Sequence, residues 1–177
     1  MPSIDTTILN KDILQVDPNT LPKFDLVYMN HAHYYIKDFK ALVRIVKELA
    51  KGETGSVLIV SNKNSPINAL FKVFFEKEHE SPYRLSEDLL SELDGMGVKY
   101  QAESLMKGAF NFDRCFTEGF SSSFSKDVLD FVTLTRLTRY PEEVTKAVVE
   151  YIQAICSKSP DKGFVCDSCD TAITLQF

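Results

Sequence analysis

Three side chains suited to binding a small molecule follow an apolar run near the N-terminus. The run Phe24–Asn30 reads FDLVYMN, and His31, Tyr34 and Tyr35 come shortly after it. Because open α/β sheets bind ligands beyond the carboxyl ends of their strands, these residues stand where a pocket is expected. Histidine donates or accepts hydrogen bonds, and tyrosine rings attract cationic amines. Strand alternation puts His33 on the other side, so we expect it to be structural.

A pair of cysteines, Cys166 and Cys169, is the next candidate for chemistry. One pair with this spacing, without a second pair or a suitably spaced histidine, is a weak signal for zinc. Redox pairs of this kind normally open a helix, whereas this one precedes a predicted strand. We therefore predict neither a metal site nor a redox site. Glu142 and Glu143 are interpreted as the first turn of a helix and not as a catalytic pair.

The composition is typical of one soluble globular domain. The chain has 177 residues, 44% of them hydrophobic and 25% charged, which suffices for a core. A net charge of −5 argues against nucleic-acid partners, because phosphate binding needs clustered Lys and Arg. No apolar stretch approaches the ~20 residues that span a membrane. Four cysteines do not indicate a secreted disulfide scaffold, so we expect a cytoplasmic protein.

A strand–helix–strand unit should position the candidate binding residues. Phe24–Asn30 has almost no polar alternation, which predicts a parallel strand covered on both faces. Asp38 can cap the following helix, and Ser56–Val60 is a second buried strand. The stripe on the helix consists of Phe39, Leu42, Ile45, Val46 and Leu49.

The remaining pattern continues to mix helices with strands, which predicts an α/β fold. Middle positions are rich in phenylalanine, most of it expected in the core and two or three side chains facing a cavity. The further predicted elements are helices from Pro66 and Ser86, a strand at Val98–Leu105, a loop over 106–123, helices at Val128–Leu137 and Pro141–Ile155, and arms of a terminal strand or hairpin at Lys162–Cys166 and Thr171–Phe177.

The N-terminal segment before Phe24 lacks a feature of nucleotide-binding domains. It has 23 residues and no glycine, so the glycine-rich cofactor loop is absent from it. Thr7–Leu14 is predicted to be a short edge strand. From Phe24 onward the pattern is that of the second half of such a domain.

Several segments, in collinear order, carry a resemblance to a known family. They are FDLVYMNHAHYYIKD with its helix and VLIVSN, SEDLLSELDGMGVKY, DRCFTEG (Asp113–Gly119), VLDFVT (Val128–Thr133) and TAITLQF. They resemble class I S-adenosylmethionine-dependent methyltransferases and, within these, the histamine N-methyltransferase family. The resemblance implies a Rossmann-like sheet, of which this chain contributes strands four to seven with flanking helices, the last strand antiparallel. Residues 1–177 would form a single partial domain, with 1–23 an extension and 24–177 the C-terminal half.

The resemblance also implies a set of site residues. Asn30 and His31 would contact the cofactor, S-adenosylmethionine. No catalytic side chain and no metal is expected, since methyl transfer to a neutral nitrogen needs alignment and desolvation more than a base. The residues implied for the substrate pocket are His31, Tyr34, Tyr35, Ile67, Phe71, Phe131 and Ser168.

Three departures from the family pattern fall on polar groups that orient histamine. The family has a glutamine at His31, an acid at Leu134, and an asparagine near Ser168 or its neighbour Asp167. Leaving a buried polar partner unpaired costs ~1–3 kcal/mol, so such exchanges are not neutral. The resemblance therefore supports methyl transfer more strongly than it supports histamine as the acceptor.

The function expected from the sequence is N-methylation of a small amine or imidazole such as histamine, with this chain a C-terminal fragment. The alternatives are a catalytically inactive truncated product and a binding module that depends on a partner. Without strands one to three, Phe24–Asn30 becomes an exposed apolar edge able to pair with another chain. We accordingly expect weak or absent S-adenosylmethionine binding by this chain alone.

Overall fold

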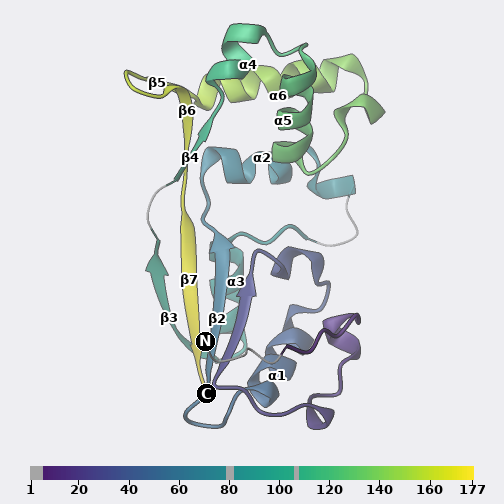
Figure 1. Ribbon diagram of the computed structural model, residues 1–177, viewed down its shortest axis with the longest axis vertical. Coiled ribbons are helices and arrows are strands. Elements are labelled where there is room, and N and C mark those ends of the chain that lie inside the picture. The colour runs from purple at the N-terminus through teal and green to yellow at the C-terminus, as the bar shows by residue number, and fades with distance from the viewer. Residues whose placement is uncertain (1–5, 79–81, 106–107) are drawn as a thin grey trace.

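Two sheets organise the chain, the larger below and the smaller above in Figure 1. The computed structural model describes residues 6–78, 82–105 and 108–177. Within them the larger sheet has the strand order β1-β2-β7-β3 and the smaller the order β4-β6-β5. The strands of the larger sheet are β1 (Leu26–Asn30), β2 (Ser56–Asn62), β3 (Lys99–Ser104) and β7 (Asp170–Gln176).

The larger sheet confirms the predicted α/β fold and its antiparallel last strand. β1 and β2 are parallel, and β7 lies between β2 and β3, antiparallel to both. This topology brings the C-terminal segment against the second strand of the predicted strand–helix–strand unit. Ile59 of β2 is opposite Ile173 of β7, for example.

Helices α1 (Phe39–Leu49) and α3 (Ser86–Gly95) bury their apolar stripes on the same face of this sheet. The Asp38 side chain accepts a hydrogen bond from the Ala41 amide at 2.8 Å, which caps α1 as predicted. The principal members of this core are Phe39, Leu42, Val43, Val46, Val57, Ile59, Leu89, Leu93, Ile173 and Leu175.

The opposite face of β1 is not covered within the described residues, and this corrects the prediction of a strand buried on both faces. Leu26 and Tyr28 are 55% and 56% exposed. Val27 and Met29, which alternate with them, pack on the α1 side. β1 is also an edge, because β2 is its strand partner in the described part of the chain. An apolar run has the same pattern whether or not a second layer covers it.

The upper part packs helices against the smaller sheet around a second core. Buried members of this core include Leu70, Phe71, Phe75, Phe112, Cys115, Leu129, Val148 and Ile152. Its elements are α2 (Pro66–Phe74), β4 (Gly108–Asn111), α4 (Asp113–Glu118), α5 (Ser123–Thr133), α6 (Glu142–Ile155), β5 (Ser157–Ser159) and β6 (Gly163–Ser168). Short 3-10 helices lie at Ile13–Gln15, Pro18–Thr20, His33–Tyr35, Glu76–Glu78 and Leu137–Arg139.

β6 and β7 form one extended path that links the two sheets, visible in yellow in Figure 1. Cys169 alone separates them in sequence. The predicted terminal arms are therefore consecutive strands and not a hairpin, since β6 pairs with β4 and β5. Ser168 and Asp170 lie at the junction of the two sheets for this reason.

Three further predictions of local structure were wrong. Residues 7–14 form no strand, and Asp12 instead caps the 3-10 helix at Ile13–Gln15. The predicted loop over 106–123 contains β4 and α4 in its described part. The helix expected at Val128–Leu137 is shifted, because α5 begins after Ser122. β4 forms through its pairing with β6, and α5 begins at its Ser122 cap, neither of which apolar periodicity reports.

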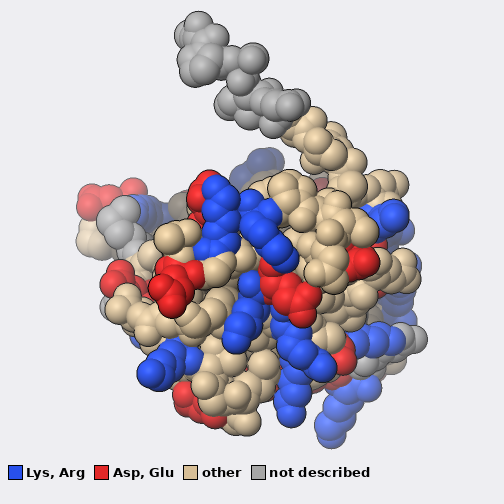
Figure 2. All heavy atoms as spheres, turned by 90° about the horizontal axis from the view of Figure 1, so that it is seen from below, with Lys and Arg blue, Asp and Glu red and all other residues tan. Residues whose placement is uncertain are grey.

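Lys and Arg side chains are mixed with Asp and Glu on the end of the molecule seen in Figure 2. This end therefore presents no continuous surface of one charge. None of the described helices is long and apolar enough to cross a membrane.

Candidate functional site

A pocket of about 380 Å³ lies where the ends of β1 and β2 meet α2 and α5. All the residues that the resemblance implies for the substrate line it, although their segments are far apart in sequence. They are His31, Tyr34, Tyr35, Ile67, Phe71, Phe131 and Ser168. Asn30 is exposed and is outside this lining, as is Asp167.

His31 joins the end of β1 to the pocket. Its amide still donates to the Val60 carbonyl at 3.1 Å, but its φ is 50°, in the left-handed region. Such a conformation is uncommon for a residue other than glycine and turns the chain sharply. The turn leads directly into the 3-10 helix that carries Tyr34 and Tyr35.

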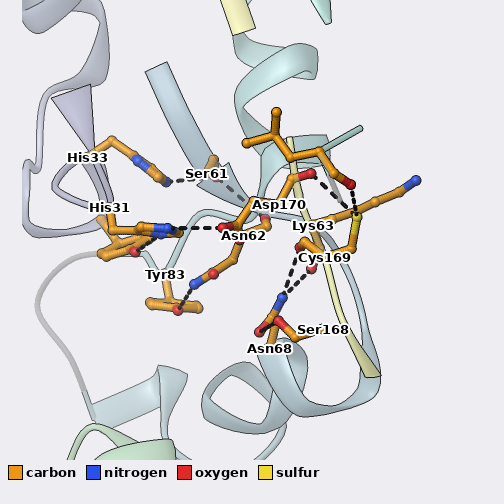
Figure 3. A network of polar contacts seen from close by, with 12 residues as sticks. His31, His33, Ser61, Asn62, Lys63, Asn68, Tyr83, Ser168, Cys169 and Asp170 are labelled. Carbon is orange, nitrogen blue, oxygen red and sulfur yellow. Dashed lines mark hydrogen bonds and ion pairs between the residues drawn. The ribbon is translucent and has the colours of Figure 1, made fainter. Parts of the chain in front are cut away.

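The ring of His31 bridges two other pocket residues. Its Nε2 lies 3.3 Å from Oδ2 of Asp170, and its Nδ1 lies 2.8 Å from the Tyr34 hydroxyl. Figure 3 shows His31 and Asp170 pointing toward one another across the ends of the sheet. A carboxylate only accepts, so Nε2 donates to Asp170 and, in the neutral ring, Nδ1 accepts from Tyr34.

An aromatic wall surrounds this pair. The Tyr34 ring stacks on Tyr83 with centroids 4.9 Å apart, and Tyr83 contacts Phe71 at the same separation. Burial raises the pKa of Tyr34 and also that of Tyr83, so both hydroxyls keep their protons at neutral pH. Tyr35 is 73% exposed and lies at the rim.

Helix α2 supplies a second wall, and its start explains why. The Ser65 side chain caps the helix, and Pro66 occupies the first turn, where no amide donor is required. Ile67 and Phe71, one turn apart, are both buried and line the pocket. Between them, Asn68 accepts from the Ser168 hydroxyl at 3.3 Å and donates to the Lys63 carbonyl at 2.9 Å.

The end of α5 forms the third wall. Phe131, which is 66% exposed, faces Phe110 with ring centroids 6.4 Å apart. Leu134 ends the helix with a φ of 52° and also lines the pocket. Phe131, Val132 and Leu134 have no polar side-chain atoms, so this wall is apolar.

Four pocket residues with polar side-chain atoms were not predicted from the sequence: Asn62, Asn68, Tyr83 and Asp170. Asn62 could have been found, because it lies two residues beyond the carboxyl end of the predicted strand Ser56–Val60. It donates to the Tyr83 hydroxyl at 3.1 Å. Asp170 gave no such signal, since its position beside His31 depends on the insertion of β7 next to β2.

Asp170 gives the pocket its charge. Among the described residues that line it, Asp170 is the acid, and no Lys or Arg lines it. The carboxylate is one-third exposed. Together with the rings of the three walls, this arrangement suits a small molecule that is partly apolar and bears a positive charge.

His33 is buried and does not line the pocket, in agreement with the expectation of a structural role. Its Nε2 lies 3.1 Å from the Arg84 carbonyl and 3.0 Å from the Ser61 hydroxyl. Burial lowers the pKa of His33 from 6.5 to about 4. A neutral ring therefore holds these segments together at physiological pH.

The four cysteines are unpaired thiols. Cys166 is buried in β6, and burial raises its pKa. Burial likewise raises the pKa of Cys156, to about 12. Reactive thiols have lowered pKa values, so these environments oppose nucleophilic or redox use.

Comparisons with known proteins identify relatives in sequence and fold. No protein-family model matches the chain. Histamine N-methyltransferases of Rattus norvegicus and Mus musculus are each 28% identical to it over 118 residues, 64% of this chain and 39% of theirs. The chain thus spans about two fifths of the length of these relatives. The crystal structure of a candidate methyltransferase from Bacillus halodurans matches with a TM-score of 0.52 and 18% identity, covering 94% of this chain and 69% of that one.

Proposed function

We propose that this chain, which is similar in sequence to histamine N-methyltransferases and has the fold of class I S-adenosylmethionine-dependent methyltransferases, forms the acceptor-binding part of an N-methyltransferase. One observation carries the proposal. Seven residues from separate segments, implied by the family resemblance, surround a single pocket at the carboxyl ends of two parallel strands. Ligands of open α/β sheets bind at this position.

The proposed cofactor is S-adenosylmethionine, and the described residues fit it in part. Asn30 has an exposed side chain on the uncovered side of β1, next to Tyr28. The ring of His31 is already engaged by Tyr34 and Asp170, and its amide by Val60. Asn30 thus offers one available amide side chain, which is few polar contacts for a charged cofactor. This supports the expectation that this chain alone binds S-adenosylmethionine weakly.

The mechanism follows from the walls of the pocket. The cofactor, when bound, supplies an electrophilic methyl group. The rings of Tyr34, Tyr83 and Phe71 hold the acceptor in a fixed orientation and exclude water from its nitrogen. A neutral nitrogen attacks with its own lone pair, so no general base is required of this chain.

The proposed acceptor is a small amine or imidazole, histamine among them. The identity of the curated relatives and a pocket of about 380 Å³ support this class. The different residues at His31, Leu134 and Ser168 make a different amine of similar size an equal candidate. The proposed location is the cytosol, supported by four unpaired thiols.

The test uses the longest product of the transcript that encodes this chain. It is incubated with methyl-labelled S-adenosylmethionine and a panel of small amines and imidazoles, and labelled product is measured. Methylation of at least one amine supports the proposal. If S-adenosylmethionine binds to saturation and no amine is methylated, the proposal fails.

A second candidate function is a binding module that depends on a partner, which the exposed β1 edge favours. Calorimetric titration of the 177-residue chain with S-adenosylmethionine distinguishes a partner-dependent module from an autonomous enzyme. We expect weak or absent binding of S-adenosylmethionine, because Asn30 is the main available contact. A dissociation constant in the micromolar range would contradict this expectation and support an autonomous enzyme.

A further inference from the structure

We propose that Asp170 anchors a positively charged group of the acceptor, so that the pocket selects organic cations over neutral molecules of the same shape. The inference rests on the proposed acceptor role of this pocket, and it assigns the selectivity to one carboxylate. It also assigns His31 the task of positioning that carboxylate.

The charge of the pocket is the first argument. Asp170 is the acid among the described lining residues, and no Lys or Arg shares the lining with it. The nearby Lys63 directs its Nζ to the Ser104 hydroxyl at 3.1 Å. Within the described chain, the ion pair of Asp170 is with His31, so a lysine or arginine does not neutralise the carboxylate there.

The second argument is hydrogen-bonding capacity. A carboxylate has two oxygens and about four acceptor positions. His31 occupies Oδ2 at 3.3 Å, and the side chain is 32% exposed. The carboxylate therefore retains acceptor positions for a ligand, whereas both ring nitrogens of His31 are already engaged.

The third argument is rigidity. Asp170 is the first residue of β7 and is opposite Asn62 of β2 in the ladder. Its carbonyl accepts from the Leu105 amide at 2.9 Å. A strand held on both sides places the carboxylate more firmly than a loop would, which favours recognition of a charged group in a defined position.

Aromatic rings near the carboxylate complete the site. Tyr34 binds the other nitrogen of His31 and stacks on Tyr83, and Phe71 packs on Tyr83. Ring faces attract cations and do not attract neutral alcohols in the same way. A cation held by Asp170 would lie in a pocket whose other walls also favour its charge.

The test compares two probes of nearly equal shape, 2-phenylethylamine, which is cationic at pH 7, and the neutral 2-phenylethanol. Binding to the wild-type chain and to Asp170→Asn is measured by calorimetry. We expect the wild type to prefer the amine by about tenfold and the variant to lose that preference, with alcohol binding unchanged. Asparagine retains the acceptor for His31, and thermal unfolding checks that the fold is kept.

Asp167→Asn is the matched control. Asp167 is an exposed acid of the preceding strand and is outside the pocket lining. It should leave the preference intact. The proposal is overturned if both variants weaken amine binding equally, if Asp170→Asn has no effect, or if the wild type shows no saturable binding of the amine.

The positioning role of His31 has its own readout. His31→Ala should reduce amine affinity several-fold without changing alcohol affinity. His31→Gln should restore the affinity, because a glutamine amide can donate to Asp170 and accept from Tyr34. Equal loss of both probes in the two variants would indicate a merely structural role and would contradict the assignment.

These binding measurements need no cofactor and no turnover. If the protein methylates no amine but its preference for cations depends on Asp170, the role of Asp170 is supported and the proposed function is refuted. Methylation that is indifferent to acceptor charge and to Asp170→Asn would do the reverse.

Discussion

At the scale of the residue, His33 couples the stability of the protein to pH. Its Nε2 lies within hydrogen-bonding distance of the Arg84 carbonyl, and its buried Nδ1 has no partner within the described residues. Burial lowers the pKa of the folded state from 6.5 to about 4. Between these two pKa values His33 is protonated in the unfolded chain and neutral in the folded chain, so the free energy of unfolding falls as pH falls.

We predict that the free energy of unfolding decreases by about 3 kcal/mol between pH 7 and pH 4 through His33, following 1.36 kcal/mol per pKa unit. Urea denaturation at several pH values measures the slope. His33→Gln should flatten it, because glutamine can still donate to the Arg84 carbonyl but does not titrate. The control is His31→Gln, which removes a histidine whose side chain is 31% exposed in the pocket. Equal slopes in wild type and His33→Gln would contradict the prediction.

At the scale of the element, the end of α5 shapes a wall of the pocket through an unfavourable conformation. Leu134 closes the helix at a φ of 52°, and its amide donates to the Asp130 and Phe131 carbonyls. Glycine is the usual residue at such a helix end, because a side chain is disfavoured there. Leu134 is 42% exposed, so packing offsets only part of this cost.

We predict that the free energy of unfolding of Leu134→Gly is higher than that of Leu134→Ala by about 1 kcal/mol. Both variants lose the leucine side chain, but only glycine adopts the left-handed conformation without strain. Thermal and urea unfolding of the two variants give this difference directly. Equal stability would show that the left-handed conformation costs nothing at this position. Acceptor binding should respond to both variants alike, because both remove the same part of the wall.

At the scale of the whole molecule, the larger sheet has helices on one face and an exposed apolar edge. Leu26 and Tyr28 are more than half exposed on the face opposite α1. An unpaired apolar edge is a site for pairing with another chain. We propose that a partner strand covers this edge, in which case the edge is free to pair with a second copy when the chain is isolated.

We predict that the isolated chain self-associates as its concentration rises, and that Tyr28→Lys shifts the association to at least about tenfold higher concentration by placing a charge on the edge. Sedimentation velocity over a concentration series measures the shift. Val73→Lys is the control, because Val73 is 58% exposed on α2, away from β1. A monomer at all concentrations, or an equal effect of both variants, would contradict the prediction.

Local structure followed from the sequence wherever periodicity and capping agree. Helices α1, α2, α3 and α6 begin close to their predicted positions, and α6 also ends at the predicted Ile155. Their capping residues and apolar stripes are local features of the sequence, which is why these starts could be predicted. The binding candidates after β1 were also predictable, since ligand sites follow strand ends.

The tertiary structure alone decided how distant segments combine. The pairing of β4 with β6 joins segments that are far apart in sequence, and the exposure of Leu26 and Tyr28 on β1 is a property of the packing of the described residues. Asp170 is 139 residues after His31, as their numbers show, yet their side chains meet at 3.3 Å because β7 enters beside β2. The sequence determined which side chains this protein has near its strand ends, and strand order determined which carboxylate faces them, because hydrogen-bonded register between remote strands leaves no local pattern.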